Sequence, residues 1–493
     1  MLDLGGVPVL ADERTELKNL VVAGGPCTFN PEPLCKFVDL FFIGEGEQLD
    51  NEVVELYRKH KLNGSSKQEF LREAAQIEGV YVPSLYTVEY NSDGTIKSFE
   101  PKDNAPKTVK KRIVKDLDNA PYPNQFVVPY VETVFDRASV ELFRGCIRGC
   151  RFCQAGFIYR PVREKKAETV NAQARCLCES TGYDEVSLLS LSSSDYTELN
   201  ELLTDMLSWT EQKRINLALP SLRIDNFSDE LLEKIASVKK SGLTFAPEAG
   251  TQRLRDAINK NVTEQEVLST CKTAFEGGYT AVKLYFMMGL PTETLEDIEG
   301  IANLAQKIVD MYYYMPNRPK GKSVSVSISC ATFVPKPFTP FEFEAQDDFE
   351  TIAKKQQHLV DSVKSKKIQL SWHDRETSLL EAVLARGDRK VGEVIYEAFK
   401  SGCRFDSWSE FFDYDKWQKA FEKCDVSPEF YANRRREYDE INPWDFIDIG
   451  VTKDFFIKQN KLAYQNVSTP HCRLQCAGCG ATTYKEGLCC EKR

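Results

Sequence analysis

From residue 138 onward the chain alternates between strand-like and helix-like segments, and this alternation constrains the fold more than any other feature. Apolar runs of strand length occur at 139–144, 185–192, 215–224, 242–248, 279–289 and 323–334. Helix-like segments separate them, and Thr263 precedes one with an acidic first turn, as a helix N-cap does. Repeated β-α units predict a parallel, curved sheet. We therefore expect an α/β fold in which residues 138–345 form a partial (β/α)6 TIM-like barrel, with its site at the carboxyl ends of the strands.

The rest of the 493 residues is too long for a single core and divides into further parts. Residues 1–60 hold short apolar strands that end in glycine, as in the last part of a Rossmann-like domain. Residues 61–137 indicate an insert and a linker, with a hairpin turn at 91–94. Residues 346–463 favour a helical C-terminal domain, and residues 464–493 form a cysteine-rich tail.

Composition narrows the class of protein. No run of eighteen apolar residues is present, so we expect no membrane span. The net charge of −10 argues against a general nucleic-acid-coating surface, although a local basic site remains compatible with it. The first residues lack the basic-then-apolar pattern of a secretory signal, so we expect a cytoplasmic protein.

Half of the 16 cysteines fall into two tight groups. They are Cys146, Cys150 and Cys153, then Cys472, Cys476, Cys479, Cys489 and Cys490. Without a secretory signal, clustered cysteines indicate metal ligands in preference to a disulfide framework.

The first group directly follows the first barrel strand. Its spacings of four and three residues let three sulfurs converge in a loop, and Gly145 and Gly149 allow the backbone to wrap closely. Three thiolates are one short of the four that close an ordinary [4Fe–4S] site, so one iron would keep an open position for a ligand. The alternative is a structural zinc knuckle, for which no fourth Cys or His lies nearby in sequence.

A C-x3-C-x2-C motif after the first strand of such a barrel resembles the radical S-adenosylmethionine (SAM) superfamily over residues 138–345. The resemblance implies that Cys146, Cys150 and Cys153 form the catalytic centre by holding a [4Fe–4S] cluster whose open iron binds SAM. It also implies reductive cleavage of SAM to methionine and a 5′-deoxyadenosyl radical that abstracts hydrogen from the substrate, while the protein positions and shields it. An electron donor such as flavodoxin or ferredoxin is the implied partner.

The same resemblance assigns cofactor contacts near the cysteines and at the strand ends. They are Phe152, Ser193, Asp195, Arg223, Glu248 and Gly289. Asp195 would accept a hydrogen bond from the SAM ammonium group, Arg223 would pair with the carboxylate, and Glu248 would bind the ribose. Gly289, in the loop 287–294, would pack along the adenine. The alternative for the polar residues that end the second strand is a helix N-cap.

The N-terminal region extends the resemblance. Residues 21–33 (VVAGGPCTFNPEP) and 39–47 (DLFFIGEGE) resemble the last portion of the cobalamin-binding domain that precedes many radical SAM barrels. Nearly the whole chain resembles one uncharacterised family of such proteins. Most of the cobalamin-type domain is missing, so we expect a chain shortened at its start. None of the four histidines lies in an Asp-x-His-x-x-Gly motif, and cobalamin binding is therefore doubtful.

The tail repeats the spacing of the first group. Cys472, Cys476, Cys479 and Cys489 supply four sulfurs, enough to close a tetrahedral zinc site or a second [4Fe–4S] cluster. A segment so rich in Gly, Thr and Cys needs a metal to fold. Because about a hundred residues of helical sequence separate it from the barrel, we expect it to fold locally around its own metal, with a structural role.

A basic stretch at 144–166 has two interpretations. Its charged residues are Arg144, Arg148, Arg151, Arg160, Arg163, Lys165 and Lys166, against Glu164 alone. They could meet an anionic substrate, or they could offset the negative charge of the cluster and pair with acidic helices.

These observations favour a radical SAM oxidoreductase or transferase that acts on an unidentified substrate, an RNA or a protein. Methyl transfer follows from the cobalamin-type remnant. One alternative is an RNA-modifying or sulfur-inserting radical SAM enzyme with an auxiliary cluster in the tail. Another is a non-catalytic interaction module with two zinc sites.

Overall fold

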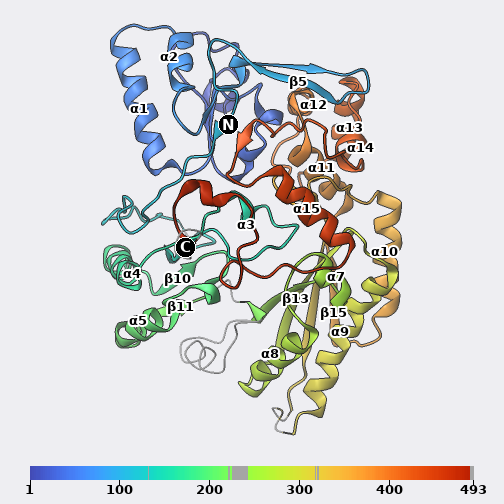
Figure 1. Cartoon of the computed structure of the whole chain (residues 1–493). Helices are drawn as coiled ribbons and strands as arrows, with labels where there is room; N and C mark the ends of the chain where they lie inside the picture. The colour runs from blue at the N-terminus through green and yellow to red at the C-terminus, as the bar shows by residue number, and fades with distance from the viewer. Residues whose placement is uncertain (132, 220–222, 225–242, 317, 319–320, 489–493) are drawn as a thin grey trace. The chain divides into compact units, whose positions relative to one another are not determined.

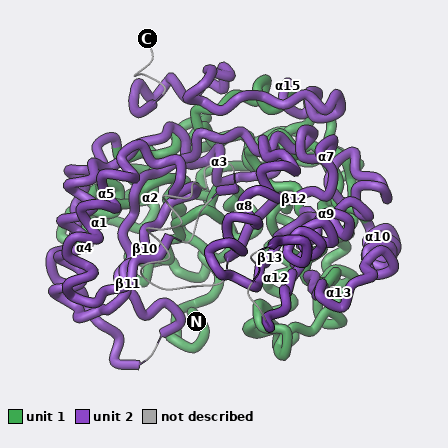
Figure 2. The backbone as a smooth tube through the Cα atoms, turned by 90° about the horizontal axis from the view of Figure 1, so that it is seen from below, with its two compact units in different colours: residues 1–114, 334–347, 374–457 green, residues 115–333, 348–373, 458–493 purple. Residues whose placement is uncertain are grey.

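A computed structural model of the chain describes residues 1–131, 133–219, 223–224, 243–316, 318 and 321–488 (Figure 1). The chain forms two compact units, each assembled from segments far apart in sequence (Figure 2). Unit 1 comprises residues 1–114, 334–347 and 374–457. Unit 2 comprises residues 115–333, 348–373 and 458–493. The predicted cysteine ligands and SAM contacts that the structure describes all belong to unit 2.

Unit 2 is built on two parallel sheets. The first has the order β11-β10-β7, with β7 (Ala138–Glu141), β10 (Glu185–Leu189) and β11 (Asn216–Ala218). The second has the order β12-β13-β14-β15, with β12 (Leu243–Glu248), β13 (Ala281–Met288), β14 (Ser325–Thr332) and β15 (Ile368–Trp372). The predicted α/β class with parallel sheets is confirmed. Closure of the two sheets into a partial barrel stays a prediction.

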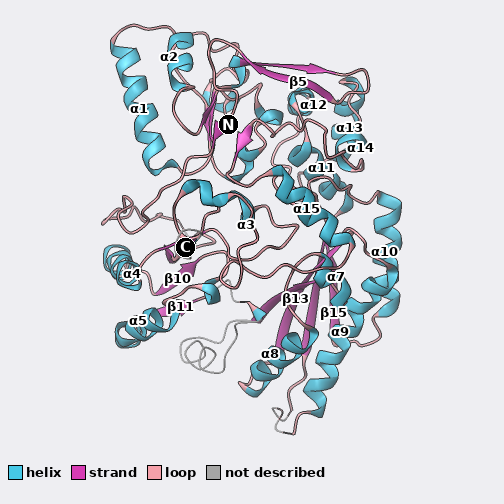
Figure 3. Cartoon of the chain, viewed as in Figure 1, coloured by secondary structure: helices cyan, strands magenta, loops and turns pink. Residues whose placement is uncertain are grey.

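Helices follow the strands, as β-α repeats require. They are α4 (Ala167–Thr181), α5 (Leu199–Lys213), α7 (Gln252–Ala257), α8 (Glu264–Glu276), α9 (Leu295–Tyr314) and α10 (Phe349–Ser362). Thr263 caps α8 in a capping box with Glu266, which confirms its expected role. Figure 3 shows α8 and α9 alongside the strands of the second sheet. The helix expected at 228–241 lies outside the described residues.

Each sheet of unit 2 has its own apolar core. Val140, Val186 and Leu188 from the first sheet pack with Leu177 of α4 and Leu202 of α5. In the second sheet the buried strand residues pack against α8, α9 and α10, and this cluster includes Leu284, Ile328, Phe275, Ile301 and Leu359. Alternate strand positions are buried, so the carboxyl ends of the strands are set firmly by the packing beneath them.

Three short elements carry the cysteine loop and its surroundings. Strands β8 (Phe143–Arg144) and β9 (Arg163–Glu164) pair in antiparallel fashion and close the loop between them. Helix α3 (Ala155–Ile158) lies within this loop, and helix α15 (Lys453–Tyr464) precedes the tail.

Unit 1 begins with a small sheet of β1 (Val22–Ala23), β2 (Leu40–Phe42) and β3 (Val80–Tyr81). Its further elements are α1 (Gly46–Leu62), α2 (Lys67–Ala74), β4 (Tyr86–Tyr90), β5 (Ile96–Pro101), β6 (Val109–Lys110), α11 (Arg375–Arg386), α12 (Arg389–Lys400), α13 (Tyr414–Lys423), α14 (Pro428–Ala432) and β16 (Ile447–Asp448). Strands β4 and β5 form the hairpin expected around residues 91–94. Among the described residues, no helix combines the length and apolar character needed to cross a membrane.

Candidate functional site

The first cysteine group lies on the loop that leaves β8. Cys150 is buried, Cys146 and Cys153 are half-buried, and all three are free thiols. Burial raises the pKa of Cys146 to about 11 and that of Cys153 to about 12, and the charge of Cys150 adds to both increases. The three thiols lie on one loop of eight residues, and their role as cluster ligands stays a prediction.

The backbone of this loop needs its glycines. Gly145 has φ +90°, and a Cβ there would approach the carbonyl oxygen of Tyr159 to 2.9 Å and that of Pro161 to 3.0 Å. A Cβ on Gly149 would lie 2.8 Å from Nδ2 of Asn259, which donates a hydrogen bond to the Gly149 carbonyl. Larger residues at either position would push the loop outward. The close wrapping predicted from the two glycines is confirmed.

The donor set fits an iron–sulfur cluster. Three free thiols lie on one partly buried loop where burial disfavours the charged forms of Cys146 and Cys153, and bound metal is what stabilises thiolates in such a place. In the part of the chain that the structure describes, no three or more His, Cys, Asp or Glu side chains are grouped so that they could hold a metal ion. A [4Fe–4S] cluster is wider than one ion, because its protein sulfurs bind different irons.

Asp195 forms a buried ion pair with Arg148, a residue of the cysteine loop. The carboxylate accepts from Nε of Arg148 at 3.0 Å and from Nη2 at 2.6 Å, and it also accepts from the Ser192 hydroxyl at 2.6 Å. Although burial acts to raise the pKa of Asp195, these hydrogen bonds and the Arg148 charge hold it below its usual range. The Arg148 backbone N–H in turn lies 3.4 Å from Sγ of Cys146. Asp195 thus anchors the segment between the first two cysteines.

The neighbouring serines are part of the same strand end. Ser193 is fully buried in the short 3-10 helix Ser193–Asp195, and its hydroxyl shares a hydrogen bond of 3.0 Å with Ser190. The helix that follows, α5, begins after Glu198 and has no side-chain cap, so the N-cap interpretation of the polar motif is not what the structure has.

Lys260 connects three of the predicted SAM contacts, and the sequence reasoning missed it. Its Nζ lies 3.1 Å from Oε1 of Glu248 and 6.0 Å from the ring centroid of Phe152. Its carbonyl oxygen accepts from Nη2 of Arg223 at 3.1 Å. Its charge also acts to lower the pKa of Cys153. Phe152, Glu248 and Arg223 therefore meet around one lysine beside the cysteine loop.

Two asparagines with positive φ flank this lysine. Asn259 has φ 54° and Asn261 has φ 52°, a conformation that asparagine tolerates better than most residues. The Asn-Lys-Asn sequence after α7 is a signal from which this turn, and with it Lys260, could have been predicted.

Gly289 lies in a turn of its own at the end of β13. It has φ 89°, and its N–H donates to Oε2 of Glu293 at 2.7 Å. Glu293 also pairs with Lys355 of α10 at 2.8 Å. These contacts fix the loop 287–294 at the carboxyl end of the second sheet, where an adenine contact was predicted.

The tail packs along the cysteine loop, which corrects the expectation that it folds locally. The Cys472 N–H donates to the carbonyl of Ile147, and the Leu488 N–H donates to that of Val162, at 3.0 and 3.1 Å. Arg473 also pairs with Glu164 at 2.6 Å. Figure 1 shows this red segment beside α3. Long-range hydrogen bonds and apolar contacts, which local sequence does not encode, place it there. Cys489 lies outside the described residues.

Arg160 joins the two cysteine groups. The residue is 3% exposed, and its guanidinium donates to the carbonyls of Gly156 and Arg148, both at 2.9 Å. Although burial acts to lower the pKa of Arg160, the charges of Cys479 and Cys472 raise it, and Cys146 adds to this effect.

The basic stretch is an internal framework. Arg148, Arg151, Arg160, Arg163 and Lys165 are all buried. Arg151, for example, donates to the carbonyls of Ala257 and Val467 at 2.7 Å each. These buried residues are not exposed for an anionic substrate, and the interpretation that the stretch serves internal contacts is the one the structure supports.

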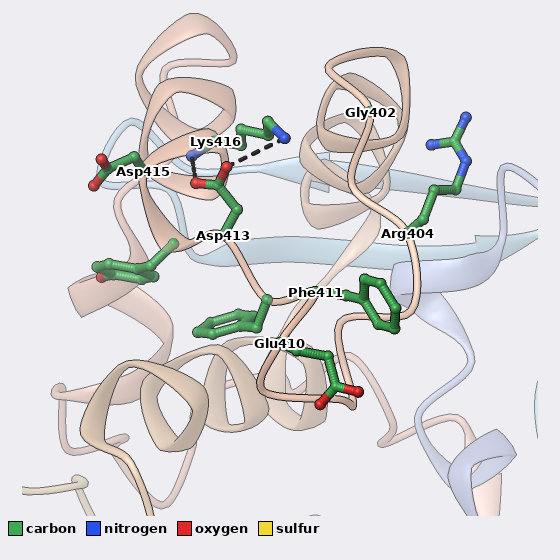
Figure 4. A pocket seen from close by; sticks show the side chains of 9 residues that line it. Gly402, Arg404, Glu410, Phe411, Asp413, Asp415 and Lys416 are labelled. Atoms are coloured by element: carbon green, nitrogen blue, oxygen red, sulfur yellow. Dashed lines mark hydrogen bonds and ion pairs between the residues drawn. The ribbon is translucent and has the colours of Figure 1, made fainter.

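A separate pocket in unit 1, of about 580 Å³, contains none of the predicted site residues. Gly402, Arg404 and residues 410–416 line it, and Figure 4 shows Arg404, Glu410 and Phe411 among them. Asp413 caps α13 and forms an ion pair with Lys416 at 3.2 Å, so its charge serves the helix.

Comparisons with known proteins identify families and relatives that this chain resembles. A family model for the N-terminal region of radical SAM proteins matches residues 1–83, and that for the radical SAM superfamily matches residues 140–305. An uncharacterized protein of Methanocaldococcus jannaschii is 29% identical over 79% of this chain and 76% of its own length. An uncharacterized methyltransferase of Pyrococcus horikoshii is 25% identical over 58% of each chain. The solved radical SAM methyltransferase TsrM of Kitasatospora setae, with cobalamin and a [4Fe–4S] cluster bound, is 13% identical over 82% of this chain and 81% of its own, with a TM-score of 0.47.

Proposed function

Because the chain belongs to the radical SAM superfamily, we propose that Cys146, Cys150 and Cys153 ligate a [4Fe–4S] cluster at which this enzyme cleaves SAM reductively. The observation that carries the proposal is the presence of three free thiols on one tightly wrapped, partly buried loop. When bound and reduced, the cluster supplies the electron that converts SAM into methionine and a 5′-deoxyadenosyl radical.

The protein's own residues stabilise the thiolates. Lys260 and Arg223 place positive charge beside the loop and act to lower the pKa values of Cys153 and Cys146, respectively. The Arg148 N–H stabilises negative charge on the Cys146 sulfur, and Asp195 holds Arg148 in place. Asp195 therefore contributes by positioning the loop through its ion pair with Arg148.

SAM would lie between the cysteine loop and the strand ends. We assign its carboxylate to Arg223 and its ribose to Glu248, with Phe152 beside them, because all three side chains are grouped around Lys260. We assign the SAM ammonium group to Ser193, which follows β10. We assign the adenine to Gly289, which follows β13. Glu248 is held by Lys260, so its orientation is set before SAM binds.

We propose methyl transfer as the reaction class. The support is the similarity to the Pyrococcus horikoshii methyltransferase. The substrate is an RNA or a protein, and a one-electron donor such as flavodoxin or ferredoxin supplies the reducing equivalent. Cobalamin is not part of the proposal, because none of the four histidines lies in an axial-ligand motif.

The test is SAM cleavage by protein reconstituted anaerobically with iron and sulfide and reduced with dithionite. We expect slow release of 5′-deoxyadenosine and methionine without added substrate, measured by mass spectrometry. Cys424→Ala is the matched control, since this half-buried cysteine belongs to neither group. A wild-type protein that binds iron and SAM but releases no 5′-deoxyadenosine contradicts the proposal. Transfer of an isotopically labelled methyl group from SAM to RNA or protein fractions tests the reaction class.

A further inference from the structure

The loop 287–294, which follows β13, contains a β-turn with an unusual residue at its centre. The Glu293 N–H donates to the Leu290 carbonyl at 3.0 Å and closes the turn. Its central residues are Pro291 and Thr292, and Thr292 has φ 69°. Proline fixes a negative φ at the first central position, so the turn fits type II, in which the second position favours glycine. A β-branched residue is strained in this conformation, and a group outside the turn must hold Thr292 there.

Arg253 of α7 is the group that holds Thr292. Its Nη1 donates to the Thr292 hydroxyl at 3.2 Å, and its Nη2 donates to the Thr292 carbonyl at 2.9 Å. Nη1 also donates to Oδ1 of Asn466 at 3.4 Å. The fork of a guanidinium suits two acceptors on one residue, a geometry that the single ammonium group of lysine does not reproduce. Threonine strains the turn, but it also offers the guanidinium a hydroxyl that glycine lacks.

Asp297, in the first turn of α9, fixes Arg253 in turn. Its carboxylate pairs with Nη2 of Arg253 and accepts from the Thr251 hydroxyl. It also accepts from the N–H and the hydroxyl of Thr294 at 2.8 and 2.9 Å. Asp297 is 2% exposed, so its charge depends on these donors. One buried carboxylate therefore joins the start of α9 to the guanidinium that holds the turn.

The backbone around this carboxylate is closely packed. A Cβ on Gly250, just before α7, would overlap the carbonyl oxygen of Asp297. A Cβ on Gly300 of α9 would lie 2.8 Å from Cγ2 of Thr251. The starts of the two helices are therefore locked together, and Arg253 reaches the loop from a fixed base.

We propose that Arg253 is a positioning residue for SAM, because it holds the turn at Thr292 and with it the loop 287–294. The inference rests on the proposed function, to which the assignment of the adenine to this loop belongs. Glu293 accepts from the Gly289 N–H at 2.7 Å on one side of the turn, and Arg253 holds Thr292 on the other. The loop is thus formed before SAM arrives, and SAM binding does not have to order it.

The first measurement is hydrogen exchange, by mass spectrometry, of peptides that span residues 289–294 in the full chain without SAM. Thr292→Val removes the hydroxyl and keeps the branched shape, so it should raise the exchange rate about threefold. Thr292→Ser keeps the hydroxyl and should keep the wild-type rate. Arg253→Gln should raise the rate about tenfold. Arg58→Gln, which breaks an exposed pair with Glu55 on α1, is the control and should leave the rate unchanged.

The second measurement is the SAM affinity of anaerobically reconstituted proteins by isothermal titration. Arg253→Gln should weaken SAM binding about fivefold, because the formed loop is less populated, and the visible absorbance of the cluster should stay unchanged. Glycine adopts the left-handed conformation without help, so the Arg253→Gln, Thr292→Gly double variant should bind SAM within about twofold of wild type. A general loss of stability would not be repaired by this change, so the rescue separates positioning from folding.

A double variant that binds SAM as weakly as Arg253→Gln overturns the inference, and so do wild-type exchange and affinity in Arg253→Gln. Thr292→Val leaves the Arg253–Asp297 pair in place, so it decides the matter if Arg253→Gln does not fold, and an unchanged exchange rate in this variant also overturns the inference. Failure of the two proposals is distinguishable. A wild type that neither binds nor cleaves SAM refutes the proposed function. A wild type that does both, beside unaffected Arg253 and Thr292 variants, refutes only the positioning role.

Discussion

The two cysteine groups of unit 2 share a spacing but reach their places by different means. The first follows β8 directly, and a glycine turn and the β8–β9 pairing form its loop from neighbouring sequence. The second follows no strand and takes its position from hydrogen bonds to Ile147 and Val162. When neighbouring residues form the loop of a motif, the position of that motif in the fold can be predicted from sequence. When distant residues hold a motif in place, its position cannot be predicted in this way. We therefore expect the loop of the first group to keep its structure when the tail is changed. The tail should depend more strongly on the first loop.

The largest expected effect concerns the first group alone. Cys150→Ala should reduce 5′-deoxyadenosine release to the background of protein-free reactions, because a methyl group cannot ligate iron. Cys479→Ala in the tail should lower the rate without abolishing it. Both are measured on the same anaerobic preparations by mass spectrometry. Equal, complete loss in both variants would remove the distinction between the groups.

The next effect concerns the ion pair that anchors the first loop. Asp195→Asn removes the charge that offsets buried Arg148, so it should lower the free energy of unfolding by about 3 to 5 kcal/mol. It should also reduce the iron bound by the first group. Asp205→Asn, at an exposed position of α5, is the matched control and should change neither quantity. Denaturant unfolding and iron analysis check this, and a stable Asp195→Asn protein with full iron contradicts the anchoring role.

Removal of the tail tests whether its contacts with the first loop support iron binding by the first group. A chain that ends at residue 470 loses the Cys472, Arg473 and Leu488 contacts to the first loop, which should lower the free energy of unfolding by about 2 to 4 kcal/mol. Because those contacts hold residues 147 and 162–164, iron loading at the first group should also fall. Leu474→Ala, at an exposed tail position, serves as the control. Unchanged loading and stability in the truncated chain would mean that the two groups are independent.

Sequence reasoning reached the parts of this site that depend on local pattern. The β-α alternation, the cap at Thr263 and the glycine turn at Gly145 all arise from residues close together in the chain. It missed β15, because IQLSW is short and lies within helical, charged sequence.

Pairings between distant residues had no local signal. The Arg148–Asp195 pair joins residues 47 positions apart, and Arg151 donates to Val467 from the other end of unit 2. The sequence shows that residues 144–166 are rich in basic side chains. It does not show that these side chains are buried, because burial depends on which segments pack over them. Lys260 was overlooked for the same reason, since its importance comes from partners on three other elements.

The smallest expected effect tests the SAM side of the first group. Glu248→Gln keeps the size of the side chain but removes its charge, and with it the ion pair to Lys260 at 3.1 Å. We expect SAM to bind more weakly by about 1 to 3 kcal/mol, because one charge-assisted hydrogen bond to the ribose is lost. The cluster spectrum should stay unchanged, since Glu248 acts on SAM and not on iron. Isothermal titration with SAM measures the affinity, and visible absorbance reports the cluster.

Glu276→Gln, which breaks an exposed pair with Lys272 on α8, is the control and should leave both the affinity and the absorbance unchanged. If Glu248→Gln instead loses iron, the carboxylate supports the cysteine loop through Lys260 and Cys153, and the ribose must have another partner.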